Sequence, residues 1–342
     1  MAKIDVFLEE MLSMGASDLH LHADYPASFR IDGNLTKSGK DLSNKQVISL
    51  LGEILSKNQK QTLNKGCEVD FAYALDNIGR FRGNVFMQDG KFGGVFRIIP
   101  EEIKGFEEIQ APFVLQSIAE FTSGLILVTG PTGSGKSTTM ASMIDHINNY
   151  KRGHILTIED PIEFVHKDKK CFIQQKEIGI DIKSFSDGLK ISKIENPDVV
   201  LIGEIRDQES MISALNLAES GILVLATLHT MNVANTVKRV VGLFDENNQT
   251  MIRSRFAHNI AAIVSMRLLP AMEGGRVPAY EVLVSNAASR NLIIEAKDHQ
   301  MDSILEGSKK EGMQTFGMHV KRLLSERKIS QDTASLYLKR DV

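Results

Sequence analysis

The sequence predicts a two-domain protein, with a small α+β domain at the N-terminus and a larger α/β domain in which helices cover a mostly parallel sheet. The first observation is length: 342 residues with 42% hydrophobic side chains exceed one ordinary core and suit two. The second is the alternation of short apolar runs with helical segments beyond residue 112. The third is an acidic, irregular stretch at residues 101–112, which separates the two patterns.

Composition argues against several classes of function. Lys and Arg number 40 against 43 for Asp and Glu, so the net charge of −3 gives no basic field for nucleic acid, which we do not expect as a partner. The only cysteines, Cys67 and Cys171, lie far apart and outside any CxxC pattern, which favours a reducing compartment over zinc or disulfide chemistry. Acidic residues interrupt the N-terminus, and no apolar run approaches the roughly 18 to 20 residues that cross a bilayer. We therefore expect no export signal and no direct membrane insertion.

The elements of the N-terminal domain follow from residue spacing. Apolar residues at helical spacing predict one short helix over residues 4–15. Residues 17–36 alternate apolar and polar side chains and contain Asp32-Gly33, a dipeptide suited to a tight turn, so they predict two antiparallel strands. The rest of the domain is helical at residues 44–60 and strand-like in three runs at 69–75, 79–88 and 93–99.

A connector and a second set of elements follow. Pro100 lacks an amide donor and restricts the residue before it, so with residues 101–112 it predicts an interdomain linker. Four apolar runs then indicate buried strands, at residues 125–130, 154–160, 199–204 and 223–229. Their alternation with helical segments predicts the parallel sheet. Near the C-terminus, apolar residues on one side of a helix predict a packing face made of Met313, Phe316, Val320, Leu323 and Leu324.

The strongest motif is GPTGSGKS, which fits GxxxxGK[ST] and lies between a predicted strand and a predicted helix. Its glycines let successive backbone amides point inward, and the following helix directs its positive end to the same place, so the segment is suited to phosphates. Lys136 is expected to reach the β- and γ-phosphates of a nucleotide, and the Ser137 hydroxyl to ligate Mg²⁺. The expected nucleotide-binding residues are Gly130, Pro131, Thr132, Gly133, Ser134, Gly135, Lys136, Ser137 and Thr138.

Hydrolysis also needs a carboxylate for the metal and a group that orients water. Glu204 ends the run VVLIGE, so we expect its carboxylate at the carboxyl end of a strand, where open α/β sheets bind ligands, and assign it to Mg²⁺. The stretch IEDPIE contains Glu159, Asp160 and Glu163, any of which could accept a proton from water. His229 ends another apolar run and could sense the γ-phosphate, although a lone histidine is more often only a hydrogen-bonded polar residue.

Four sequence boxes together suggest a family. GPTGSGKST, IEDPIEFVH, NPDVVLIGEIRD and TLHT, in that order, resemble the secretion ATPases of the type II and type IV pilus superfamily. The segments SDLHLHADYPASFRIDG and GRFRGNVFMQDGKFGGVFRIIP resemble the PAS-like domain of the type IV pilus retraction ATPases, the PilT and PilU kind. The resemblance covers nearly the entire chain. It implies a PAS-like α+β domain at residues 1–100, a linker at 101–112 and a RecA-like P-loop NTPase domain with C-terminal helices at 113–342.

The resemblance also implies roles for single residues in Mg²⁺-dependent hydrolysis of ATP. Glu163 corresponds to the general base of the family, and Glu204 to the glutamate that supports Mg²⁺. His229 falls on the histidine box. Arginines of the RFR and VFR segments reach the phosphates in the family when the two domains close. The matching residues here are Arg82 and Arg97, with Arg80 as a weaker match.

The same resemblance implies an assembly and a place of work. Family members form hexameric rings, so we expect a homohexamer, alone or mixed with a paralogue, with nucleotide between the two domains of a subunit and a hinge in the linker. The expected location is the cytoplasmic face of the bacterial inner membrane, where the motor would turn an inner-membrane platform protein. The expected output is pilus retraction and twitching motility.

Three alternatives stay open beside retraction. Lys190 and Ile194 stand where the family has arginines, and Ile222 where it has a histidine, so the chain could be an accessory or regulatory pilus ATPase with weak hydrolysis. An extension or type II secretion ATPase would push pilins outward, but such proteins have a four-cysteine zinc-binding insertion, and no cysteine follows Cys171. A DNA or RNA translocase would need a concentrated basic groove.

Overall fold

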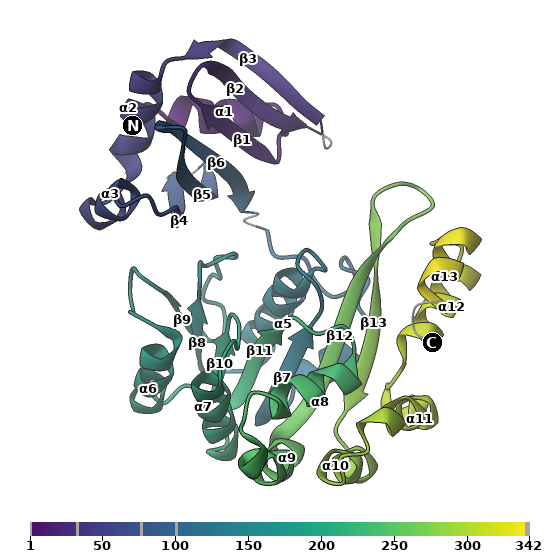
Figure 1. Cartoon of the computed structure of the whole chain (residues 1–342). Helices are drawn as coiled ribbons and strands as arrows, with labels where there is room; N and C mark the ends of the chain where they lie inside the picture. Colours follow the sequence, from purple (N-terminus) through teal and green to yellow (C-terminus); the bar gives the residue numbers. More distant parts are fainter. Residues whose placement is uncertain (1, 32–33, 76–77, 100–101, 339–342) are drawn as a thin grey trace. The chain divides into compact units, whose positions relative to one another are not determined.

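The computed structural model describes residues 2–31, 34–75, 78–99 and 102–338. The chain divides into two compact units, which are Met1–Glu102 with Pro161–Val165, and Ile103–Asp160 with His166–Val342 (Figure 1). The short segment 161–165 therefore groups with the first unit, although it follows a strand of the second. The turn expected at Asp32-Gly33 and the start of the connector at Pro100 lie outside the described residues.

The first unit is built on an antiparallel sheet. Its described strands pair in the order β3-β2-β1-β6-β5-β4, each antiparallel to its neighbours. They are β1 (Asp18–His22), β2 (Tyr25–Ile31), β3 (Asn34–Leu42), β4 (Val69–Leu75), β5 (Gly79–Gln88) and β6 (Lys91–Ile99). The first of the two strands expected in residues 17–36 is divided into β1 and β2. The division occurs because Asp24 adopts a positive φ of 65° in a tight turn between them.

Helices supply one side of the first core. They are α1 (Asp5–Ser13), α2 (Asn44–Ile54) and α3 (Lys57–Asn64). The helical pattern at 44–60 forms two helices rather than one, because Leu55 is extended and Ser43 and Ser56 each begin a helix with a capping box. The core side chains come from the helices and the facing side of the sheet, and include Leu8, Leu51, Leu63, Phe29, Phe81 and Phe96.

The second unit contains the parallel sheet that the apolar runs predict. Its described strands follow the order β13-β12-β7-β11-β10-β8-β9, and all neighbours except β12 and β13 run parallel. They are β7 (Gly124–Thr129), β8 (His154–Glu159), β9 (Phe172–Glu177), β10 (Val199–Ile202), β11 (Leu223–Leu228), β12 (Ile260–Pro270) and β13 (Arg276–Val284). The expectation of a mostly parallel sheet is confirmed.

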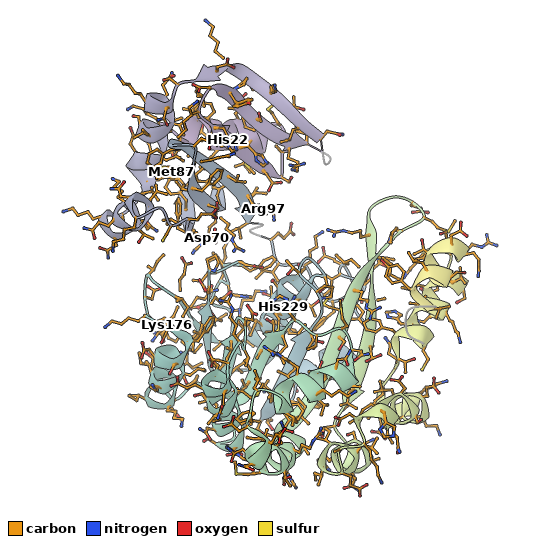
Figure 2. All side chains as sticks on the ribbon, viewed as in Figure 1. His22, Asp70, Met87, Arg97, Lys176 and His229 are labelled. Atoms are coloured by element: carbon orange, nitrogen blue, oxygen red, sulfur yellow. The ribbon has the colours of Figure 1, made fainter. Side chains whose placement is uncertain are left out.

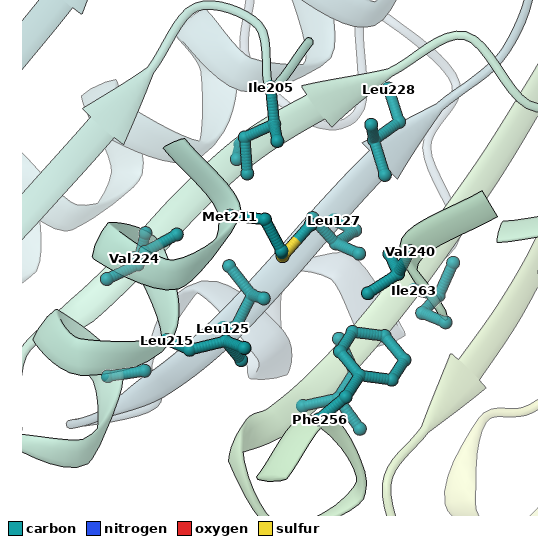
Figure 3. Close-up of a cluster of buried hydrophobic side chains, with 14 of the residues drawn as sticks. Leu125, Leu127, Ile205, Met211, Leu215, Val224, Leu228, Val240, Phe256 and Ile263 are labelled. Atoms are coloured by element: carbon teal, nitrogen blue, oxygen red, sulfur yellow. The ribbon is translucent and has the colours of Figure 1, made fainter. Parts of the chain in front are cut away.

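Both faces of this sheet are buried, which explains the unbroken apolar runs. Leu125 and Leu127 enter one core and Ile126 and Val128 the other, as alternation along a strand requires. Figure 3 shows the first core, where Met211, Val240 and Phe256 meet Leu125 and Leu127. The helices that contribute to the two cores include α4 (Val114–Ala119), α5 (Lys136–Tyr150), α6 (Phe185–Glu195), α7 (Gln208–Glu219), α8 (Val233–Val241), α9 (Glu246–Asn259) and α10 (Ala287–Ile294).

The C-terminal helices pack on the hairpin β12–β13 (Figure 1). The elements here are 3-10 helices at Asp298–Gln300 and Lys309–Glu311, and α11 (Met301–Gly307), α12 (Phe316–Ser325) and α13 (Gln331–Leu338). Phe316, Val320 and Leu323 form the expected packing face, with Leu324 partly buried beside them. Met313 differs from the expectation, since it precedes the helix and packs into the core of the parallel sheet.

Candidate active site

The P-loop joins β7 to α5 in the second unit. Gly130, Gly133 and Gly135 have φ values of 149°, 76° and 95°, which side chains other than glycine rarely adopt. Gly135 is the N-cap of α5, and no side chain caps this 15-residue helix. The amides of its first turn are therefore left for an anion, in line with the helix dipole.

Lys136 is folded into the loop. The residue is 8% exposed. Its Nζ donates hydrogen bonds to the carbonyl oxygens of Gly130, at 2.9 Å, and Pro131, at 3.0 Å. The hydroxyl of Ser134 is buried and has no hydrogen-bond partner among the described residues. A buried ammonium needs acceptors, and phosphate oxygens are stronger acceptors than these carbonyls. The geometry is thus suited to exchange the loop carbonyls for a phosphate.

Glu204 and His229 lie together because their strands are neighbours. β10 and β11 are adjacent and parallel, so the residues that follow them emerge at the same edge of the sheet. His229 Nε2 is 3.3 Å from Glu204 Oε1. Arg206 Nε donates to Glu204 Oε2 at 2.8 Å, and Arg206 Nη1 is 3.9 Å from Asp160 Oδ2. Glu204 thus contacts His229 directly, and Arg206, which the sequence does not single out, joins Glu204 to Asp160.

Arg206 is the functional candidate that sequence reasoning missed. Its hydrogen bond to Glu204 raises the pKa of the guanidinium, which keeps its charge beside the two carboxylates. The available signal was its place two residues after Glu204 in the same loop. In a helix a residue two positions further on points to another face, and here the loop that follows β10 brings Arg206 onto the carboxylate.

The acids of the IEDPIE segment go to different places. Glu159 Oε1 accepts hydrogen bonds from Thr157 Oγ1, at 2.6 Å, and Gln175 Nε2, at 3.2 Å, so its carboxylate is engaged within the sheet. Glu163 groups with the first unit, where its Oε1 is 3.7 Å from Arg82 Nη1. The segment therefore separates an acid that is hydrogen-bonded within the parallel sheet from one that is paired with an arginine of the first unit.

Arg82 and Arg97 lie directly opposite each other on β5 and β6 of the first unit. Arg82 Nη2 is 3.9 Å from Asp70 Oδ2, and Arg97 Nε donates to Asp18 Oδ1 at 2.7 Å. The two arginine side chains are 41% and 70% exposed. Figure 2 labels Asp70 and Arg97 in this unit, and His229 in the other. The sequence-predicted arginines thus form a cross-strand pair on one face of the sheet.

The residues that depart from the family pattern leave their elements intact. Lys190 Nζ is 3.2 Å from Glu209 Oε1, so the position still has a cation with an acidic partner. Ile194 is 84% exposed on α6 and adds nothing to the core. Ile222 packs against the core of the parallel sheet. The first of the three residues is therefore ion-paired, the second is exposed, and the third is partly buried.

A cavity of about 1040 Å³ adjoins the P-loop within the second unit. Pro131, Thr132 and Ser134 line one side, and the hairpin β12–β13 with α12 lines another. The guanidinium carbon of Arg267 lies 4.6 Å from the ring centre of Phe316 at its edge. Cations and acids are mixed on its walls, so its chemistry does not select one class of ligand.

Along the part of the chain that the structure describes, no helix combines the length and the apolar character that crossing a bilayer requires.

Comparison with known proteins covers nearly the whole chain. A family model described as type II/IV secretion system protein matches residues 102–331. The type IV pilus retraction ATPase PilT of Pseudomonas aeruginosa is 43% identical over 321 residues, which are 94% of this chain and 93% of that protein. A twitching motility protein of Neisseria gonorrhoeae is 41% identical over 89% of this chain and 82% of its own length. The resemblance read from the four boxes is confirmed.

A solved structure shows the same fold. The crystal structure of the pilus retraction motor PilT with bound ADP aligns with a TM-score of 0.91 at 41% identity, over 98% of this chain and 96% of that one. The match confirms the expected fold class, a RecA-like ATPase domain preceded by a smaller α+β domain.

Proposed function

The chain belongs to the type II/IV secretion system protein family, and we propose that it hydrolyses ATP to power the retraction of type IV pili. The observation on which the proposal depends is the P-loop between β7 and α5 in a chain 43% identical to a pilus retraction ATPase. The structurally similar motor PilT contains ADP, which supports a nucleotide as the ligand. Retraction of surface fibres would also account for the relative named for twitching motility.

In this proposal the nucleotide binds along residues 130–138, with its β- and γ-phosphates at Lys136. Mg²⁺ fits the residues present, because the Ser137 hydroxyl and the Glu204 carboxylate are hard oxygen donors, and magnesium typically uses one or two such groups beside phosphates and waters. Among the described residues, no cluster of three or more His, Cys, Asp or Glu forms a dedicated metal cage. When bound, the ion would neutralise charge that develops on the phosphates.

The protein's own groups then divide the remaining work. Glu163 accepts a proton from the attacking water as the water oxygen bonds to the γ-phosphorus. The bond between the γ-phosphorus and the β–γ bridging oxygen breaks, so ADP leaves with that oxygen and phosphate is released. Arg206 orients the Glu204 carboxylate through the 2.8 Å hydrogen bond. His229 contacts the other carboxylate oxygen of Glu204 and responds to the γ-phosphate. Arg82 and Arg97 neutralise phosphate charge, a contribution of about 10³ to 10⁵ in rate for an arginine in such reactions.

We also propose the assembly and the location that the resemblance to the family implies. The active form is a homohexamer, alone or with a paralogue, at the cytoplasmic face of the inner membrane. Its mechanical partner is an inner-membrane platform protein of the pilus, and nucleic acid is not a partner. The near balance of 40 basic and 43 acidic residues supports the last point.

Turnover of ATP by the purified protein tests the enzymatic part. We expect Mg²⁺-dependent release of phosphate from the wild type, and its loss in Glu204→Ala. The matched control is Glu209→Ala, which removes an exposed glutamate paired with Lys190 and should leave turnover unchanged. Equal background rates in the wild type and Glu204→Ala would favour the regulatory alternative.

Pilus behaviour in cells that lack the protein tests the direction of work. Excess fibres that do not retract are expected for a retraction motor. Cells without fibres would instead indicate an extension ATPase and would contradict the proposal.

A further inference from the structure

Asp18 is a buried carboxylate on the first sheet. It lies on β1 between Arg97 of β6 and Arg30 of β2, its direct cross-strand neighbours, and is 3% exposed. Its Oδ1 accepts from Arg97 Nε at 2.7 Å, and its Oδ2 accepts from Ser17 Oγ at 2.7 Å. Arg30 Nε lies 3.7 Å from Oδ2. A buried ionised group is costly unless it is paired and hydrogen-bonded, so these contacts are a condition for its charge.

The charge of Asp18 is secured by its surroundings. Burial works against ionisation, but hydrogen bonds from Ser17 and Arg97, with the charge of Arg97, hold the pKa of the carboxyl below its usual range. Asp18 is therefore ionised at neutral pH and provides a fixed, buried negative charge on the sheet.

The Asp18 carboxylate contacts the inner part of the Arg97 guanidinium, at Nε. The hydrogen bond to Asp18 uses Nε, and the Arg97 side chain is 70% exposed, so much of the guanidinium stays accessible to a ligand. An arginine fixed at Nε has given up rotamer freedom before a ligand arrives, which lowers the entropic cost of binding. The planar fork then presents its outer N–H groups in the arrangement that matches two oxygens of a phosphate.

The neighbouring strand gives a second reason for a buried acid beside Arg97. Arg82 lies directly opposite Arg97, and like charges in that arrangement destabilise a sheet. The ion pairs of Arg82 with Asp70 and Glu163 are long, at 3.9 and 3.7 Å. Asp18 supplies a buried counter-charge to Arg97, on the strand that flanks Arg97 on the side away from Arg82. Of the two opposed arginines, Arg97 is therefore the one that a buried acid holds in a defined place.

We propose that Asp18 is a positioning residue, whose carboxylate holds Arg97 in the orientation that meets the phosphates of ATP. The inference rests on the proposed function, in which Arg97 acts on those phosphates. Asp18 itself touches no reacting atom. Its effect on turnover passes through Arg97 alone.

The test is a double-mutant cycle on steady-state ATP hydrolysis. Asp18→Asn keeps the size of the side chain and removes the charge, and is expected to lower kcat about tenfold. Arg97→Ala is expected to lower kcat by about 10² to 10³, as for other donors to a transition state. Because the effect of Asp18 passes through Arg97, the double variant should be no slower than Arg97→Ala. Asp24→Asn, which breaks an exposed pair with Lys91, is the control and should keep the wild-type rate.

A second variant keeps the proposal testable if Asp18→Asn folds poorly. Arg97→Lys changes only an exposed side chain, and its single ammonium cannot bond to Asp18 and extend a fork to phosphate at once. We expect it to be as slow as Arg97→Ala. Wild-type kcat in Arg97→Lys would overturn the proposal, as would an Asp18→Asn effect of equal size with and without Arg97.

The outcomes separate this inference from the proposed function. If the wild type does not hydrolyse ATP, or Arg97→Ala turns over normally, the proposed function or the role of Arg97 is wrong. If the wild type and Arg97→Ala behave as expected but folded Asp18→Asn has the wild-type kcat, the positioning role alone is wrong.

Discussion

Replacing Gly130 with alanine tests the geometry of the P-loop. Gly130 has a φ of 149°, and a Cβ at this position would overlap the carbonyl oxygen of Met266 and approach the hydroxyl of Ser134. The hydroxyl can rotate, but Met266 lies in β12, which is paired on both sides, with β7 and β13. The added methyl group therefore cannot be accommodated without moving the loop or the strand.

The magnitude follows from two contributions. A side chain in a sparsely populated φ region costs about 1 to 3 kcal/mol, and an added carbon in a packed site costs a similar amount. Their sum of about 2 to 6 kcal/mol lowers the melting temperature by about 4 to 24 °C for a domain of this size. If the loop moves to relieve the overlap, its amides no longer converge, and affinity for ATP falls instead.

Thermal unfolding and ATP binding by calorimetry measure the two outcomes in parallel. Gly274→Ala in the β12–β13 hairpin is the control, because its φ is also positive, at 89°, but nothing lies within 4 Å of an added Cβ. It should cost about 1 to 2 kcal/mol and leave ATP affinity unchanged. Gly130→Ala with the same melting temperature and ATP affinity as Gly274→Ala would show that the close approach to Met266 does not constrain the loop.

Three further predictions concern single side chains. Lys136→Ala should abolish hydrolysis while the protein stays folded, as circular dichroism and phosphate release can show; wild-type turnover would contradict the assignment. Glu163→Gln should bind ATP but cleave it slowly in single-turnover assays, because an amide cannot accept the proton of water, and undiminished cleavage would move the base to Glu159 or Asp160. Burial lowers the pKa of His319 to about 4 from 6.5, so the unfolded chain takes up a proton first as pH falls. Stability should be full above about pH 6.5 and fall towards pH 4 by at most about 1.4 kcal/mol per unit, and urea unfolding of His319→Gln should show a smaller loss.

The central strands of the parallel sheet could be predicted because burial on both faces leaves an unbroken apolar run. β9 could not, since it lies at the edge of the sheet and its sequence, FIQQKE, is mostly polar. The P-loop was recognisable because its chemistry resides in one continuous segment whose spacing is set by the backbone.

Contacts between distant segments could not be predicted from the spacing of residues in the sequence. The pairing of Asp18 with Arg97 depends on β1 and β6 being neighbours, although 79 positions separate the two residues. The bond of Arg206 to Glu204 depends on the path of one loop. The choice of Glu163 as the base came from family resemblance, whereas Glu204 and His229 were also selected because each ends an apolar run. All three assignments stay predictions until the variants above are measured.

A separate hydrophobic cluster, here called the tail cluster, lies apart from the two cores of the parallel sheet. It consists of Leu269, Val277 and Ala279 of the hairpin, with Phe316, Val320 and other side chains of the C-terminal helices. Because neither the hairpin tip nor the helices can hide these side chains alone, the two should open and close as one cooperative block. Deuterium uptake by backbone amides would then rise together in β13 and α12, while β7 and β11 stay protected. A truncation that removes Phe316 and the residues after it would consequently expose an apolar surface on the hairpin and favour aggregation of the protein.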